Sequence, residues 1–156
     1  MLPHNRPSAQ EHAALIQELQ PLPIVGTSWP RWIKIASWFM LIIIGIQFIN
    51  TATSPAGQNV NPYIAASVTL CYAALLVMAR YMTTSRTRIT EEGIEQSWIT
   101  RRAVKWEEIQ FAKFIPLISS KKLMCFTGRG RPFIFQGGTK ELQIAFARIA
   151  LVYKRR

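Results

Sequence analysis

The side chains that could carry covalent or metal chemistry are few in this sequence, and they lie far apart. His4 and His12 both fall in the N-terminal segment, which we expect to be a mobile tail. Cys71 lies inside an uncharged stretch and Cys125 in a predicted strand, so we do not expect the two thiols to pair or to share a metal. The sequence contains no CxxC pair, Walker loop or GxSxG turn. These patterns predict a protein that is not an enzyme by itself and that uses no cofactor or metal.

The basic residues offer binding chemistry instead. The chain of 156 residues carries 19 Lys and Arg against 8 Asp and Glu, which gives a net charge of +11. A Lys pair and an Arg-x-Arg sequence are spaced across one predicted hairpin, where we expect them to form either a rim that binds phosphate head groups or a basic surface with no special ligand. These candidate residues are Lys121, Lys122, Arg129 and Arg131.

A second candidate site is apolar. In residues 111–118, apolar side chains occupy both parities of a predicted strand, whereas a sheet with one solvated face has polar residues at one parity. This segment is therefore either covered on both faces or in contact with a protein partner or the bilayer. The candidate contact residues are Phe111, Phe114, Ile115, Leu117 and Ile118.

Two apolar segments separate these sites from the N-terminus. They run from about residue 32 to 50 and from about residue 63 to 82, and no charge occurs between Ile35 and Ala79. As a helix, the first would be about 28 Å long, close to the thickness of the hydrocarbon core of a bilayer. A soluble core helix normally keeps a polar face, which residues 41–46 lack. We therefore expect a hairpin of two membrane spans over residues 31–82, with the first an uncleaved anchor.

The residues that flank the spans predict their orientation. Residues 51–62 carry no Lys or Arg, whereas cations precede the first span and follow the second, and 16 of the 19 cations lie at or beyond Arg80. The positive-inside rule then places both chain ends in the cytoplasm. Side chains that can anchor helices at the membrane interface also flank the spans, namely Trp29, Trp32, Tyr63, Arg80 and Tyr81.

We expect residues 1–30 to form a Pro-rich cytoplasmic tail. Ser8 and Glu11 fit a capping box that would begin a short amphipathic helix, and Pro21 would end it. This helix could lie on the membrane or on a partner, and a partly ordered tail is the alternative.

Residues 83–156 predict an α+β domain. Short segments rich in β-branched and aromatic residues alternate with turn signals, at about residues 87–90, 94–99, 103–106, 109–115, 122–127 and 132–136. Residues 91–93 are expected to form a turn in which Gly93 is able to adopt positive φ, residues 128–131 to form a hairpin loop, and Thr139 to cap a final amphipathic helix. The expected fold is an antiparallel sheet or partial barrel closed by a C-terminal helix.

Two motifs in this domain resemble a known family. Thr90-Glu91-Glu92-Gly93-Ile94 and Trp106-Glu107-Glu108-Ile109 are similar to the T-x-E-G-I turn and the W-x-E-I motif near the start of bacterial pleckstrin-homology-like domains. Many such proteins carry two spans just before the domain, as in the YcxB-like group, and the resemblance covers roughly residues 30–156. It implies a pleckstrin-homology-like fold at the bacterial inner membrane and a binding or scaffolding role.

These expectations together describe a non-catalytic, membrane-anchored scaffold whose partners are membrane lipid and a protein subunit of a membrane complex, with homo-oligomers also allowed. Two alternatives stay open, namely a sensor of anionic lipid that uses the basic hairpin and an accessory subunit of a membrane synthase or transporter. Nucleic acid is not an expected partner, because positive-inside bias explains much of the excess charge near the membrane exit.

Overall fold

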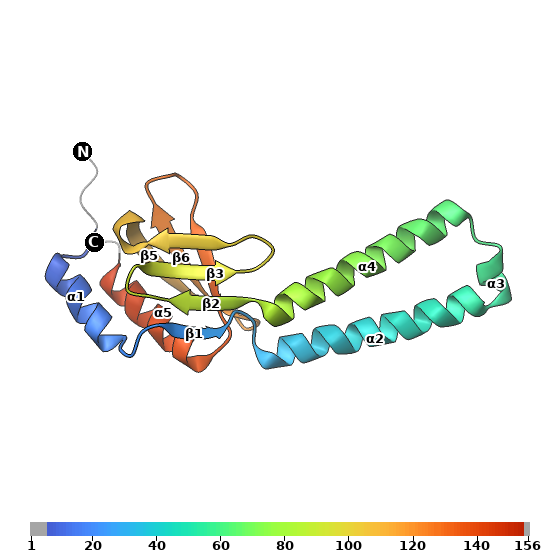
Figure 1. Ribbon diagram of the computed structural model, residues 1–156, viewed down its shortest axis with the longest axis horizontal. Coiled ribbons are helices and arrows are strands. Elements are labelled where there is room, and N and C mark those ends of the chain that lie inside the picture. Colours follow the sequence, from blue (N-terminus) through green and yellow to red (C-terminus); the bar gives the residue numbers. More distant parts are fainter. Residues whose placement is uncertain (1–5, 155–156) are drawn as a thin grey trace. The chain divides into compact units, whose positions relative to one another are not determined.

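The computed structural model describes residues 6–154 of the chain (Figure 1). His4, which we placed in a mobile tail, lies outside the described residues. The chain divides into two compact units. We call residues 31–83 the helical unit, and residues 6–30 together with 84–154 the α+β unit.

The helical unit contains the two long apolar helices that we expected. Helices α2 (Arg31–Thr53) and α4 (Pro62–Thr84) each have 23 residues, and a short helix α3 (Pro55–Gln58), which we did not predict, lies between them. Both long helices have the length and composition needed to cross a membrane. Only 6% of the apolar stretch of each helix is buried, unlike that of the core helix of a soluble protein.

Polar side chains link the two long helices. The Tyr72 hydroxyl donates to the carbonyl of Leu41 at 3.0 Å, and Trp38 Nε1 donates to Thr83 Oγ1 at 2.9 Å. A Cβ atom at Gly45 would lie 2.6 Å from Tyr72 Oη. The absence of a side chain at Gly45 therefore allows the approach of Tyr72.

The α+β unit contains two antiparallel sheets and two helices. The four-stranded sheet has the order β1-β2-β3-β4, and the three-stranded sheet has the order β5-β6-β7. The described elements are α1 (Ala9–Glu18), β1 (Ile24–Thr27), β2 (Arg86–Ile89), β3 (Gly93–Ser97), β4 (Arg102–Lys105), a 3-10 turn (Trp106–Glu108), β5 (Ile109–Pro116), β6 (Lys121–Thr127), β7 (Phe133–Gly137) and α5 (Lys140–Val152). The predicted strands after residue 86 are confirmed within two residues, and the sheets do not close into a barrel.

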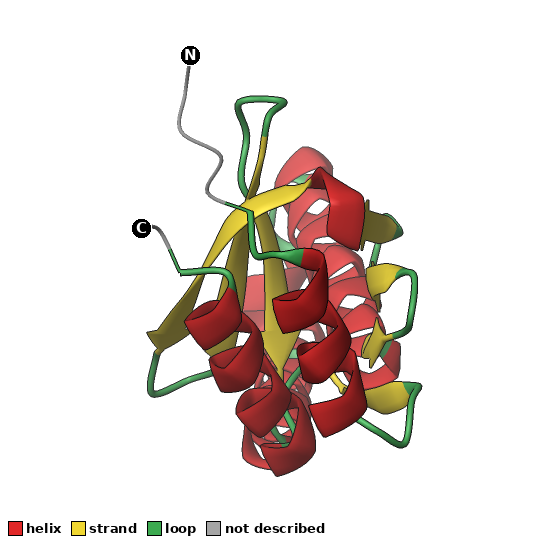
Figure 2. Ribbon diagram, turned by 90° about the vertical axis from the view of Figure 1, so that its left-hand side faces the viewer, coloured by secondary structure: helices red, strands yellow, loops and turns green. Residues whose placement is uncertain are grey.

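The segment before the first long helix belongs to the α+β unit, which differs from the separate N-terminal tail that we expected. Strand β1 pairs with β2, with Thr27 opposite Arg86, so the helical unit is an insertion between two paired strands. The predicted capping box on Ser8 and Glu11 is present at the start of α1. Leu15, on the apolar face of this helix, is 1% exposed, because α1 packs beside α5 (Figure 2).

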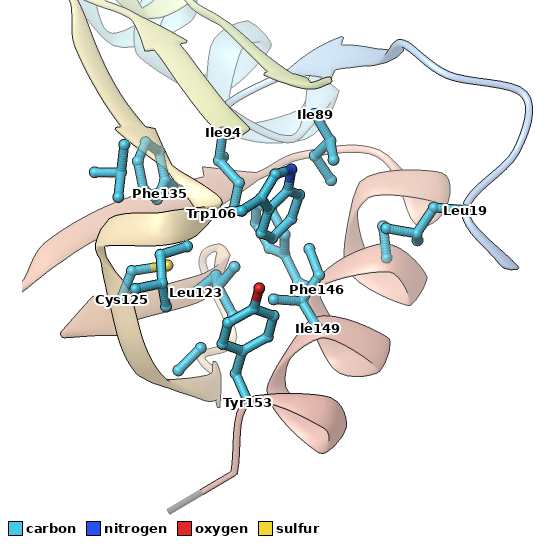
Figure 3. Packing of buried hydrophobic residues seen from close by; sticks show 14 of the residues in the cluster. Leu19, Ile89, Ile94, Trp106, Leu123, Cys125, Phe135, Phe146, Ile149 and Tyr153 are labelled. Carbon is cyan, nitrogen blue, oxygen red and sulfur yellow. The ribbon is translucent and has the colours of Figure 1, made fainter. Parts of the chain in front are cut away.

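The core of this unit lies between the two sheets and α5. Ile89 and Ile94 enter it from the four-stranded sheet, Leu123 and Phe135 from the three-stranded sheet, and Phe146 from α5 (Figure 3). As predicted, the side chain of Thr139 caps α5, accepting from the backbone N–H of Leu142.

Gly130 and Gly93 are needed for different reasons, one for its backbone conformation and the other for a close backbone contact. Gly130, in the loop between β6 and β7, adopts a φ of +83°, as a tight hairpin loop requires. Gly93 does not use its ability to adopt positive φ, since Gly130 alone among the described residues has it. Gly93 instead lies against the backbone of Val104 and Lys105 in β4, where a Cβ atom would collide.

Candidate functional site

The outer face of the three-stranded sheet is mainly apolar. The strand register puts Phe111 opposite Phe126, and Met124 opposite Ile134, on the face that points away from the core. These side chains are half-buried, and the rings of Phe111 and Phe126 stack with centroids 4.2 Å apart. We call five residues of this face the outer patch, namely Phe111, Ile115, Met124, Phe126 and Ile134.

The outer face of the four-stranded sheet has the opposite character. Arg88 lies opposite Glu95 there, and Arg86 lies opposite Ser97. Arg101, in the loop that follows, forms a 2.8 Å ion pair with Glu95. An antiparallel sheet with one solvated face has this polar composition. Within one unit, therefore, one sheet has an outer face suited to water and the other does not.

The structure distributes the five predicted contact residues over three places. Phe111 and Ile115 belong to the outer patch. Phe114 has the opposite parity and packs against the core. Leu117 and Ile118 lie in the loop between β5 and β6, where they are 45% and 99% exposed. Phe126, Met124 and Ile134 were missed, although their alternation with Leu123, Cys125 and Phe135 is the signal that could have found them.

The four predicted phosphate-binding cations do not form a single site. Lys121 and Lys122 begin strand β6, whereas Arg129 and Arg131 follow its end. The remaining residues of β6, 123–127, lie between the two pairs and place them about 20 Å apart. Arg129 in addition forms a 2.8 Å ion pair with Glu108. The structure instead brings Lys122 opposite Ile115, at one end of the outer patch.

The predicted interface anchors belong to both units. Trp32 lies in the first turn of α2 and is 57% exposed, and Tyr63 lies in the first turn of α4 and is 81% exposed. Arg80 and Tyr81 lie near the end of α4. Trp29 belongs to the α+β unit and packs edge-on against Trp98, with ring centroids 6.5 Å apart.

His12 belongs to an ordered aromatic cluster, so the expectation that it lies in a mobile tail is wrong. Its Nδ1 atom is 3.0 Å from Tyr153 Oη, and its ring centroid is 5.5 Å from that of Trp106. Burial lowers the pKa of His12 and raises the pKa of Tyr153 to about 12, so burial favours the neutral form of both groups. The cluster joins α1 to the end of α5.

A cleft of about 670 Å³ lies above this cluster, and its rim is charged. Arg6 and Lys105 supply cations to the rim, while Glu91, Glu92 and Glu107 supply carboxylates. Trp106 and Tyr153 form its floor but are only 5% and 3% exposed, so they offer little aromatic surface to a ligand.

The described thiols and acidic groups do not assemble a reactive centre. Cys125 is fully buried, which raises its pKa to about 12 and disfavours a thiolate. Cys71 lies in α4. In the part of the chain that the structure describes, no group of three His, Cys, Asp or Glu side chains could hold a metal ion.

Comparisons of the chain with protein-family models, with curated proteins and with solved structures found no match.

Proposed function

We propose that this protein is a non-catalytic, membrane-anchored scaffold whose α+β unit binds another subunit of a membrane complex on the outer patch. The observation that carries this proposal is the contrast between the outer faces of the two sheets. Five apolar side chains gather on one of them, whereas the outward side chains of the other are mainly charged or polar, with Val25 and Ala103 as apolar exceptions. Apolar surface gathered in this way is typical of an interface that a partner covers.

The charges on the same face indicate the chemistry of the partner. Lys113 lies opposite Met124, and Lys122 lies opposite Ile115, so both lysines share the face of the outer patch. A complementary partner would present apolar side chains flanked by carboxylates, as an acidic amphipathic segment does.

We further propose that the α+β unit has a pleckstrin-homology-like fold. A four-stranded and a three-stranded antiparallel sheet, followed by a C-terminal helix, support this assignment together with the two resembling motifs. The chain differs from the family pattern in one respect, because its spans follow strand β1 rather than precede the whole domain.

The proposed location is the bacterial inner membrane, with α2 and α4 as spans and both chain ends in the cytoplasm. The length and composition of the two helices support the spans. Arg31 and Lys34 at the start of α2 and Arg80 near the end of α4 support the orientation, since residues 54–62 carry no cation. Resistance to extraction by alkaline carbonate tests the anchor.

A photocrosslinking experiment in native membranes tests the binding surface. Replacing Phe126 with a photoreactive phenylalanine analogue in the full chain should produce one discrete adduct with an acidic membrane-complex subunit. Ala103 is a matched control position, because it is exposed on the outer face of the four-stranded sheet, opposite Glu95. The proposal fails if position 126 gives no adduct or if position 103 gives the same one.

A further inference from the structure

One end of the α+β unit connects to both long helices, and we call it the anchor end. The chain leaves this unit at Pro30 and returns to it at Thr84. Between these points, Thr27 pairs with Arg86, and the N–H of Ser28 donates to the carbonyl of Ser85 at 3.2 Å. Both connections therefore emerge from the same end of the β1–β2 ladder.

The loop between β3 and β4 lies at the anchor end. Arg86 pairs with Ser97, the last residue of β3, and the Ser85 hydroxyl donates to the carbonyl of Ser97 at 2.6 Å. The loop then continues through Trp98, which packs edge-on against Trp29. Ile99 follows and is 52% exposed.

The loop between β5 and β6 lies at the anchor end as well. Gly138, just after β7, donates to the carbonyl of Thr27 at 2.8 Å, and a Cβ atom there would collide with the backbone of Trp29. The preceding Gly137 pairs with Lys121, which in turn pairs with Pro116 at the end of β5. Leu117 and Ile118 therefore extend from this end of the three-stranded sheet.

The loops at the opposite end of the unit have a different composition. The turn between β2 and β3 contains Glu91 and Glu92, and the loop between β6 and β7 contains Arg129 and Arg131. The ion pair between Arg129 and Glu108 belongs to this end. Exposed apolar side chains, beside Arg101 in the β3–β4 loop, thus occur where the chain joins the long helices, whereas the two loops named at the opposite end carry charged side chains.

We propose that the exposed apolar side chains of the two loops at the anchor end, Ile99 and Leu117–Ile118, insert into the interface of an anionic phospholipid bilayer. This inference rests on one part of the proposed function, namely that α2 and α4 span the membrane. Because Pro30 and Thr84 directly adjoin those helices in the sequence, the covalent connections then hold the anchor end close to the lipid head groups. In water, the apolar side chain of Ile118 would remain 99% exposed. The membrane interface, in contrast, can accept an apolar side chain.

The cations at the anchor end would favour anionic over neutral phospholipid. Lys121 and Lys122 follow Ile118 at the base of its loop, and exposed Arg86 begins β2. Apolar side chains flanked by cations are the composition of segments that bind at anionic interfaces.

Fluorescence quenching of the full chain in vesicles tests the insertion. In a Cys71→Ser background, an environment-sensitive fluorophore is attached at Ile118→Cys, and the vesicles contain phosphatidylglycerol and phosphatidylcholine. Quenching by shallow doxyl-labelled lipid is expected, together with severalfold weaker quenching by aqueous iodide than at Arg131→Cys. Position 131 is a matched control, because its loop adjoins the opposite end of the same strand β6. Equal iodide quenching at positions 118 and 131 would overturn the proposal.

Two further measurements separate the possible failures. A fluorophore at Ile43→Cys, within α2, should be quenched by doxyl-labelled lipid whenever the helix spans the bilayer. Quenching at position 43 but not at position 118 would overturn the loop insertion alone. No quenching at position 43 would overturn the membrane anchor as well.

In the Ile118→Cys background, Lys121→Ala combined with Lys122→Ala should weaken lipid quenching in phosphatidylglycerol vesicles. Unchanged quenching would overturn the contact with anionic head groups.

Discussion

Thr87 donates a 2.6 Å hydrogen bond from its hydroxyl to the backbone carbonyl of Gln136, and this bond joins the four-stranded sheet to strand β7. The backbone N–H of the same Gln136 donates to Oε1 of Gln96 at 3.1 Å. Thr87 and Gln96 are both buried. Since β7 is an edge strand of its sheet, the side chains of Thr87 and Gln96 provide hydrogen-bond partners for the carbonyl and the N–H of Gln136, which the neighbouring strand does not pair.

Removing the Thr87 hydroxyl should destabilise the α+β unit. The substitution Thr87→Val preserves the side-chain shape but removes the donor to the carbonyl of Gln136 together with the hydroxyl contact to Ser28. We expect the free energy of unfolding to fall by about 1–3 kcal/mol. Denaturant unfolding of the full chain in detergent, followed by tryptophan fluorescence, measures the change.

Thr127 provides a matched control for this prediction. Its hydroxyl is buried on β6 but has no hydrogen-bond partner among the residues that the structure describes. Thr127→Val should therefore leave the free energy of unfolding unchanged or raise it slightly. Equal losses in the two variants would show that the Thr87 bond contributes nothing of its own.

Local signals in the sequence predicted most elements of the fold. The strands after Arg86 follow from β-branched and aromatic runs between turn residues, and α5 follows from its apolar stripe and the Thr139 cap. The long helices follow from length and hydropathy. Each of these signals lies within the element that it predicts, which is why they suffice.

Strand β1 could not be predicted in this way because its partner is distant in sequence. Ile24–Thr27 is too short to signal a strand alone, and β2 lies beyond the whole helical unit. The contact of His12 with Tyr153 likewise joins residues that are far apart in the sequence. Of the outer patch, only Phe111 and Ile115 were predicted, since the patch depends on the register of β5, β6 and β7 and not on one segment.

The N-terminal helix should contribute to the stability of the α+β unit. Leu15 is 1% exposed in the core, so Leu15→Ala leaves a cavity, and we expect the free energy of unfolding to fall by about 2–5 kcal/mol. Gln17 is an exposed position on the same helix, and Gln17→Ala should change this energy by less than about 0.5 kcal/mol. Equal stability of the Leu15 variant and the natural chain would show that α1 does not dock.

The His12 cluster predicts a loss of stability at acidic pH. Because burial lowers the pKa of His12 in the folded protein, the unfolded chain binds its proton more readily. The resulting contribution to stability is present above the unfolded pKa of about 6.5 and is lost as the pH falls through and below that value. His12→Phe preserves a ring beside Trp106 but does not titrate, so its stability should decrease less between pH 7 and pH 5. Parallel pH profiles of the two proteins would contradict this assignment.

Phe114 and Met124 test whether the two faces of the three-stranded sheet have different roles. Phe114 packs against the core, so Phe114→Asp should lower the free energy of unfolding by about 3 kcal/mol or more. Met124 points outward and lies opposite Lys113, so a carboxylate introduced by Met124→Asp faces a cation and remains partly solvated.

We expect the Met124→Asp variant to keep nearly its full stability and to lose the crosslink formed from position 126, because a charge now interrupts the apolar surface. Unfolding curves and crosslinking in membranes measure the two effects separately. If the Met124→Asp protein is folded and still forms the adduct, the outer patch is not the binding surface.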